Sequence, residues 1–86
     1  MIDFSEYDAI IKRAKELGLK KNKLYGDLPL KIGGSHGIAV RSMDKVLRIL
    51  NMEQNKLTDS DEASIDSAID TINYMVYYIM SKNGKL

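Results

Sequence analysis

Residues 65–80 read IDSAIDTINYMVYYIM, and their apolar positions recur with the period of an α-helix. The spacing of three or four residues predicts a core-facing side formed by Ile65, Ala68, Ile69, Ile72, Val76 and Ile79. Asp59 followed by Glu62 has the spacing of a capping box, and Gly84 suits a helix end. The helix is therefore predicted to open at Asp59 and to run to about Lys82. Its second half is apolar nearly all round, which indicates burial on more than one side.

A second helical pattern lies near the N-terminus. Asp3 is the predicted cap, with Glu6 three residues later as in a capping box. The helical period continues through Phe4, Tyr7, Ile10, Ile11, Ala14 and Leu17. Gly18 is the predicted stop, and residues 19–25 are expected to add another helical turn.

A third helical pattern covers about Ile38–Met52. Its apolar face consists of Ala39, Met43, Val46, Leu47 and Leu50. A loop from Gly26 to Gly37 precedes it, in which residues 27–30 are expected to be extended and residues 33–37 flexible. The polar stretch 53–60 is the predicted connection to the last helix.

These patterns predict one small all-α domain over residues 1–86. It is a bundle of three main helices with a Gly-rich loop between the first and the second. A chain of 86 residues has little protein with which to cover residues 72–80 on every side. We therefore expect a homo-oligomer, most simply a two-fold dimer.

Composition excludes several classes of protein. The net charge of +1 gives no basic bias of the kind that duplex DNA or a membrane surface attracts, so neither partner is expected. The absence of cysteine excludes disulfides and thiolate metal sites. The N-terminus lacks the basic start and apolar run of a signal peptide, and no apolar stretch is long enough to span a bilayer. The expected location is the cytoplasm, that of the host cell if the protein is encoded by a phage.

A basic stripe lies on the second predicted helix. The spacing i, i+3, i+4, i+7 places four charged residues on one face, namely Arg41, Asp44, Lys45 and Arg48. Arginine presents a fork that suits phosphate oxygens, and lysine acts as a point charge. Together with Lys23, these cations would bind a nucleotide whose base stacks on Tyr25. The alternative is that Tyr25 packs on the core at a helix end and Gly26 caps that helix.

An acidic stripe lies on the last predicted helix, at Glu62, Asp66, Asp70 and Asn73. Mg²⁺ prefers oxygen ligands and commonly combines one or two carboxylates with substrate phosphates and waters. Asp66 and Asp70 lie one turn apart and would share such an ion, with Glu62 or Asp44 assisting. The alternatives are ion pairs between these carboxylates and the basic stripe, or a solvated face.

The Gly-rich segment GGSHG at residues 33–37 directly precedes a predicted helix. Exposed amides at a helix N-terminus favour anions, although no Gly-Lys-Ser/Thr follows as in a Walker loop. His36 is the one histidine of the chain and would contact a phosphate or act as an acid or base near neutral pH. The alternatives are a plain flexible connection and a solvated histidine.

Four short motifs occur in order along the chain. They are KLYG at 23–26, GIAVR at 37–41, DKVLR at 44–48, and Asp66 followed by DTINY at 70–74. The ordered set resembles the nucleotide-modification-associated domain 1 family, a phage-type domain of unknown function, over residues 20–80. The resemblance implies a nucleotide context in phage biology. The last helix is also similar, more faintly, to that of the MazG-like all-α nucleotide pyrophosphohydrolases, which bind magnesium through acidic residues of two helices.

We therefore expect a protein that binds a nucleotide or a nucleotide-derived phosphate ligand, with sequestration of that ligand as one role. The alternatives are a metal-dependent nucleotide (pyro)phosphohydrolase and a helical protein-interaction module. The second predicted helix offers one acidic residue, Asp44, beside its basic residues. This shortage of carboxylates favours binding over hydrolysis. The candidate ligand-binding residues are Lys23, Tyr25, Gly26, His36, Arg41, Lys45, Arg48 and Asn73. The candidate ligands for Mg²⁺ are Asp44, Glu62, Asp66 and Asp70.

Overall fold

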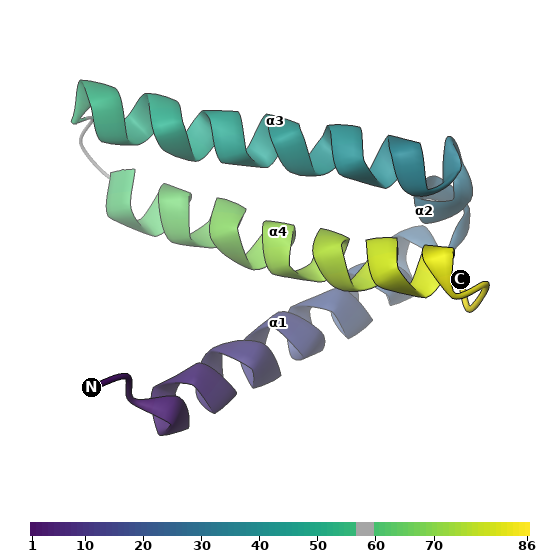
Figure 1. Ribbon diagram of the computed structural model, residues 1–86, viewed down its shortest axis with the longest axis horizontal. Helices are drawn as coiled ribbons and strands as arrows, with labels where there is room; N and C mark the ends of the chain where they lie inside the picture. The colour runs from purple at the N-terminus through teal and green to yellow at the C-terminus, as the bar shows by residue number, and fades with distance from the viewer. Residues whose placement is uncertain (57–59) are drawn as a thin grey trace.

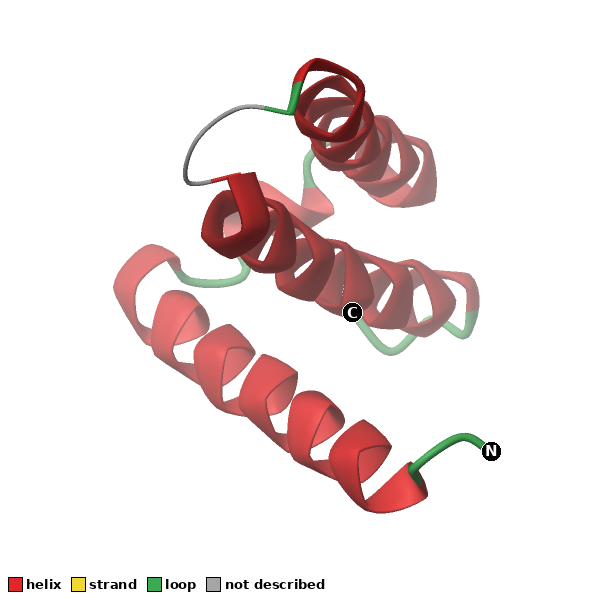
Figure 2. Cartoon of the chain, turned by 90° about the vertical axis from the view of Figure 1, so that its left-hand side faces the viewer, coloured by secondary structure: helices red, strands yellow, loops and turns green. Residues whose placement is uncertain are grey.

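The computed structural model describes residues 1–56 and 60–86. This part of the chain contains four helices. They are α1 (Phe4–Tyr25), α2 (Leu28–Lys31), α3 (Gly34–Asn55) and α4 (Ser60–Lys82). Figure 1 shows α3 and α4 side by side as an antiparallel hairpin, with α1 crossing α4 at an angle. In the view of Figure 2, α4 lies between α3 and α1. The all-α prediction is confirmed, and α4 is the central helix.

The start of α1 agrees with the sequence, but its end does not. Asp3 caps the helix, because its Oδ1 accepts hydrogen bonds from the amides of Ser5 at 3.0 Å and Glu6 at 3.4 Å. The predicted stop at Gly18 is wrong, since α1 continues without a break to Tyr25. Gly26 then ends the helix and donates its amide to the oxygen of Asn22 at 2.8 Å.

The close crossing of α1 and α4 explains why a glycine lies inside a helix. A Cβ atom at Gly18 would lie 2.9 Å from Tyr77 Oη and 3.4 Å from Asn73 Nδ2, both on α4. Glycine in a helix interior costs about 1 kcal/mol relative to alanine. At this position it allows α4 to approach, so Gly18 serves the packing of two helices rather than the termination of one.

The segment between α1 and α3 is more helical than predicted. Residues 27–30 are not extended, because α2 forms there with Pro29 in its first turn, where the missing amide hydrogen removes no helical bond. The prediction of a flexible 33–37 segment is also wrong, since α3 begins at Gly34 rather than Ile38. The turn itself falls on Gly33 and Gly34, whose φ angles of 80° and 60° favour glycine.

The other helix ends lie close to the predicted positions. α3 ends at Asn55 rather than Met52, so the first part of the predicted polar connection is helical. α4 ends at Lys82 as predicted, and Gly84 follows with a φ of 68°. Asp59, the predicted cap of this helix, lies outside the described residues. None of the described helices has the length and apolar character that crossing a membrane requires.

The buried core differs from the predicted one. Lys45 of α3 reaches Asp70 of α4, so Ile38 and Ser42, on the same side of α3, face α4 as well. Both are buried, and Ser42 Oγ donates to the oxygen of Ile38 at 3.0 Å. The apolar face predicted for this helix is exposed instead, at Ala39, Met43, Val46, Leu47 and Leu50. α3 therefore packs on α4 with a different side from the one its hydrophobic pattern marks.

The central helix shows the same discrepancy. Ile69 is buried with 3% of its surface exposed, whereas Ile65 and Ile79 of the predicted core side are 49% and 58% exposed. The accessible surface of the chain is 6671 Å². A folded monomer of this mass exposes about 5,100 Å² on average. The arrangement therefore leaves much more surface in water than a closed small domain does.

Candidate functional site

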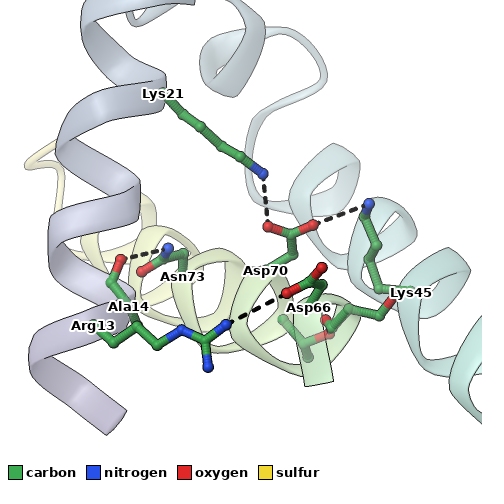
Figure 3. A network of polar contacts seen from close by, with 9 residues as sticks. Arg13, Ala14, Lys21, Lys45, Asp66, Asp70 and Asn73 are labelled. Atoms are coloured by element: carbon green, nitrogen blue, oxygen red, sulfur yellow. Dashed lines mark hydrogen bonds and ion pairs between the residues drawn. The ribbon is translucent and has the colours of Figure 1, made fainter. Parts of the chain in front are cut away.

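Asp70 connects the three long helices near the middle of α4. Its Oδ1 accepts a hydrogen bond from Nζ of Lys21 on α1 at 2.7 Å, and its Oδ2 lies 3.1 Å from Nζ of Lys45 on α3 (Figure 3). Only 15% of the Asp70 side chain is exposed. One carboxylate therefore faces two ammonium groups, and the cluster carries a net positive charge.

The environment of this cluster shifts the pKa values of two of its members. Burial alone would raise the pKa of Asp70, but the hydrogen bonds from Lys21 and Lys45 outweigh it, so the pKa lies below its ordinary value. The hydrogen bond to Asp70 raises the pKa of Lys21 against the opposing effect of burial. Asp70 and Lys21 are therefore both charged at neutral pH.

A pocket of about 280 Å³ opens beside this cluster, and we call it the interhelical pocket. Its polar lining includes two cationic side chains, Lys21 and Arg41, together with Asp70. The aromatic lining consists of Tyr25, Tyr74 and Tyr77, and the remaining lining residues are Gly18, Asn22, Gly26, Pro29, Leu30 and Asn73. Burial raises the pKa of the Tyr77 hydroxyl, so this group is neutral at physiological pH. The pocket therefore combines cations with aromatic rings.

Several residues predicted from the sequence meet in this pocket. Tyr25, Gly26, Arg41 and Asn73 all line it, and Lys45 adjoins it through Asp70. Gly26 also caps α1, as the structural alternative required. Asn73 has a packing role besides, because its Nδ2 donates to the oxygen of Ala14 at 2.8 Å (Figure 3).

Other predicted residues lie outside the pocket lining. These are Lys23, His36 and Arg48 among the ligand-binding candidates, and Asp44, Glu62 and Asp66 among the acidic ones. Asp66 Oδ1 lies 3.4 Å from Nη2 of Arg13, and both side chains are largely exposed. Such a surface ion pair contributes little to stability. The basic and acidic stripes thus meet in the pair of Lys45 with Asp70.

The ligand-binding residues predicted from the sequence did not include Lys21, Tyr74 or Tyr77, although Tyr74 is the last residue of the DTINY motif. Lys21 and Tyr25 both follow Gly18, and the helix that contains them puts the two on one face at i and i+4. Tyr74 and Tyr77 follow Asp70 at i+4 and i+7, which places all three on the same side of α4. A continuous α1 and this spacing are the signals that would have found them.

The four acidic candidates for Mg²⁺ binding lie on α3 and α4. Within residues 1–56 and 60–86, no three carboxylate or imidazole side chains come close enough together to hold a metal ion. Asp70, the most enclosed of the four candidates, is already neutralised by two ammonium groups. Binding of Mg²⁺ by Asp44, Glu62, Asp66 and Asp70 therefore stays a prediction, and no chemical step is assigned to it.

A second hollow of about 500 Å³ adjoins the pocket along α1 and α4. Its lining is mainly apolar and includes Ile11, Leu19, Val76, Met80 and Leu86. Five lining residues also line the interhelical pocket, namely Gly18, Asn22, Leu30, Asn73 and Tyr77. Among the described residues, the one cationic lining residue of this hollow is Lys15, whereas Lys21 and Arg41 together line the interhelical pocket.

The chain matches no protein-family model, no curated protein and no solved structure.

Proposed function

We propose that this protein binds a nucleotide or a nucleotide-derived phosphate ligand in the interhelical pocket, that it releases the ligand unchanged, and that it works as a homo-oligomer. The observation that carries the proposal is the presence of Lys21, Arg41 and the rings of Tyr25 and Tyr74 in one pocket of about 280 Å³. A ligand with an anionic end and a flat aromatic end satisfies both kinds of side chain.

The phosphate end would lie between α1 and α3. Arg41 offers a planar fork of donors, and Lys21 is a positive charge on the other wall of the pocket. An ammonium group has three donors, so Lys21 and Lys45 can each bond to Asp70 and to a phosphate oxygen at once. Asp70 would hold both lysines in place before the ligand arrives, and it would repel the ligand's negative charge as well.

The base end would lie against the tyrosines. Stacking of a base on an aromatic side chain contributes about 1–3 kcal/mol and tolerates every base, because each has a π-face. Tyr25 comes from the end of α1 and Tyr74 from α4, so a base could contact rings from two helices. The pocket residues Tyr25, Gly26, Arg41, Asp70 and Asn73 belong to the motifs by which the chain resembles the nucleotide-modification-associated domain 1 family, which supports a nucleotide ligand in a phage context.

Binding is favoured over hydrolysis by the state of the carboxylates. A metal-dependent phosphohydrolase needs acidic side chains free to hold metal and position water. Asp70 is instead bonded to two lysines, and Asp66 lies 3.4 Å from Arg13. This arrangement supports a role in which the ligand is held or sequestered.

The test is a panel of linear and cyclic nucleotides, titrated calorimetrically with and without Mg²⁺. Inorganic phosphate and free nucleosides, included separately, report on the two ends of the pocket. After binding, the protein is denatured and the released ligand is identified by chromatography. Recovery of the intact nucleotide supports the proposal. Product that forms only with Mg²⁺ would make the protein a hydrolase, and no binding across the panel would leave the interaction-module hypothesis.

A further inference from the structure

The α3·α4 hairpin carries an apolar surface on the side away from the interhelical pocket. We define the open hairpin face as Met43, Val46 and Leu50 of α3 with Ala68, Met75 and Ile79 of α4. All six residues are exposed, and the five larger ones expose between 40% and 58% of their surface. In the described part of the chain, α1 lies against the other side of α4 (Figure 2).

Helical phase places these residues on one common surface. At about 100° per residue, the α3 members lie about 170° around the helix from Arg41. The α4 members lie about 160° around their helix from Asp70. Arg41 and Asp70 line the same pocket, so both sets of apolar residues point to the opposite side of the hairpin. The pair Lys45 and Asp70 sets the antiparallel register, in which Met43 lies level with about Ile72 and Leu50 with about Ile65. Ala68 therefore lies between these levels, and Met75 and Ile79 continue the surface toward the C-terminal end of α4.

The amount of exposed surface suits a partner of protein size. The chain exposes 6671 Å², against about 5,100 Å² for an average folded monomer of its mass. A standard protein interface removes about 800 Å² per partner, and an obligate dimer removes more. The accessible surface that the whole chain exposes above this average is therefore comparable with the area that each subunit of an obligate dimer buries.

The chemistry of the face suits a second copy of the same chain. In a two-fold contact each patch meets its own copy, so charged residues at its centre would face like charges. None of the six residues is charged. Two helical hairpins that join their apolar sides form a four-helix bundle, an arrangement that encloses such side chains in a common core.

We propose that the open hairpin face packs against the same face of a second copy, related by a two-fold axis. This inference gives the proposed homo-oligomer its interface. It rests on no property of the ligand, because the interhelical pocket lies on the far side of the hairpin and stays accessible in the dimer.

The first experiment compares variants by light scattering and sedimentation at about 100 μM, a concentration at which weak dimers with micromolar dissociation constants are associated. Val46→Glu and Leu50→Glu place a charge in the face. Leu24→Glu is the matched control, because Leu24 is 69% exposed on α1. The wild type and Leu24→Glu should be dimers, and the other two should dissociate with at least a tenfold rise in dissociation constant. A monomeric wild type, or a dimer that persists in folded Val46→Glu and Leu50→Glu, would overturn the proposal.

A second experiment covers the case in which these charged variants do not fold. The chain has no cysteine, so single cysteines can be introduced at Met43, Val46 or Met75 and treated with a short bismaleimide. At least one of the three positions should give a covalent dimer, and Leu24→Cys should not. Cross-linking from Leu24→Cys alone would place the interface elsewhere. Ligand binding by a monomeric variant would show that the pocket works independently of this interface.

Discussion

Asn73 of α4 donates a hydrogen bond from its side-chain amide to the backbone oxygen of Ala14 in α1, over 2.8 Å. The contact lies beside Gly18, where a Cβ atom would lie 3.4 Å from Asn73 Nδ2. A backbone carbonyl has two lone pairs, so the oxygen of Ala14 can accept this bond in addition to the helical one. The bond therefore fixes the position of α1 along α4, on which the interhelical pocket depends.

Asn73→Ala should lower the free energy of unfolding by about 0.5–1.5 kcal/mol, the usual net contribution of one hydrogen bond. The measurement is urea denaturation followed by circular dichroism. Asn51→Ala is the control, because Asn51 is an exposed residue of α3 and the same gain in helix propensity applies there. Asn51 Oδ1 accepts a hydrogen bond from Asn55 Nδ2 at 2.8 Å, so Asn55→Ala is measured beside it to report the contribution of that exposed bond. Equal stability changes in the two variants would show that the bond to Ala14 contributes nothing.

The contribution of Asp70 to stability should depend on pH with a definite sign. Its pKa is lowered in the folded state, so its contribution is complete above the ordinary value of about 4 and is lost as the pH falls through the folded value. Below about pH 4 the wild type should therefore lose stability more steeply than Asp70→Asn. Chemical denaturation at a series of pH values measures both slopes. Parallel curves would contradict this assignment.

The two arginines of the basic stripe should behave differently in ligand binding. Arg41 lines the interhelical pocket and Arg48 does not. Arg41→Ala should weaken binding of the best nucleotide by about 1.5–3 kcal/mol, the cost of a lost charged hydrogen bond. Arg48→Ala should leave the affinity within a factor of two or three. Calorimetric titration measures both affinities. Similar losses of affinity in the two variants would indicate that the phosphate binds along the basic stripe rather than in the interhelical pocket.

Asp70→Asn should strengthen the binding of a phosphate ligand. The substitution removes a negative charge beside the proposed phosphate position and leaves Lys21 and Lys45 unneutralised. A gain on the order of tenfold in affinity corresponds to about 1.4 kcal/mol. The gain should shrink in high salt, where charges at the pocket mouth are screened. Loss of binding in this variant would indicate that the carboxylate contacts the ligand or its metal directly.

Substitutions at Gly18 should separate helix propensity from helix packing. Gly18→Ala gains about 1 kcal/mol of propensity, which the close contact with Tyr77 Oη offsets, so the net change should be within about 1 kcal/mol. Gly18→Leu cannot be accommodated and should destabilise the protein by about 1–3 kcal/mol. Thermal denaturation measures both. A Gly18→Leu variant as stable as Gly18→Ala would show that α1 does not pack closely on α4.

The helical period was sufficient to predict the fold class and the three long helices. It failed at glycines, because the pattern of one segment does not show what packs against it. Gly18 reads as a stop until Tyr77 is seen against it, and the helix of residues 34–37 continues through glycines that a propensity argument assigns to a loop.

The side of each helix that faces inward could not be predicted for a related reason. α3 has two sides that could pack, one marked by Met43 and Leu47 and one by Ile38 and Ser42, and only the second faces α4. Likewise Arg41 and Arg48 share a stripe in sequence, but only Arg41 lies level with the end of α1 that supplies Tyr25. Which residues of two helices meet depends on how far one helix is shifted along the other. Residue spacing within one helix does not determine this shift.

The central position of α4 has a consequence for the order in which the structure opens. Within the described residues, α1 packs mainly on α4, whereas the α3·α4 hairpin has contacts of its own. α1 can therefore separate as a cooperative unit while the hairpin persists, and its amides should exchange with deuterium before those of α4. Lys21 and Tyr25 leave the pocket when α1 separates, so only the closed form has the complete site. A ligand at one hundred times its dissociation constant would add about 2.7 kcal/mol to the closing of α1, which makes exchange protection of this helix a direct measure of occupancy.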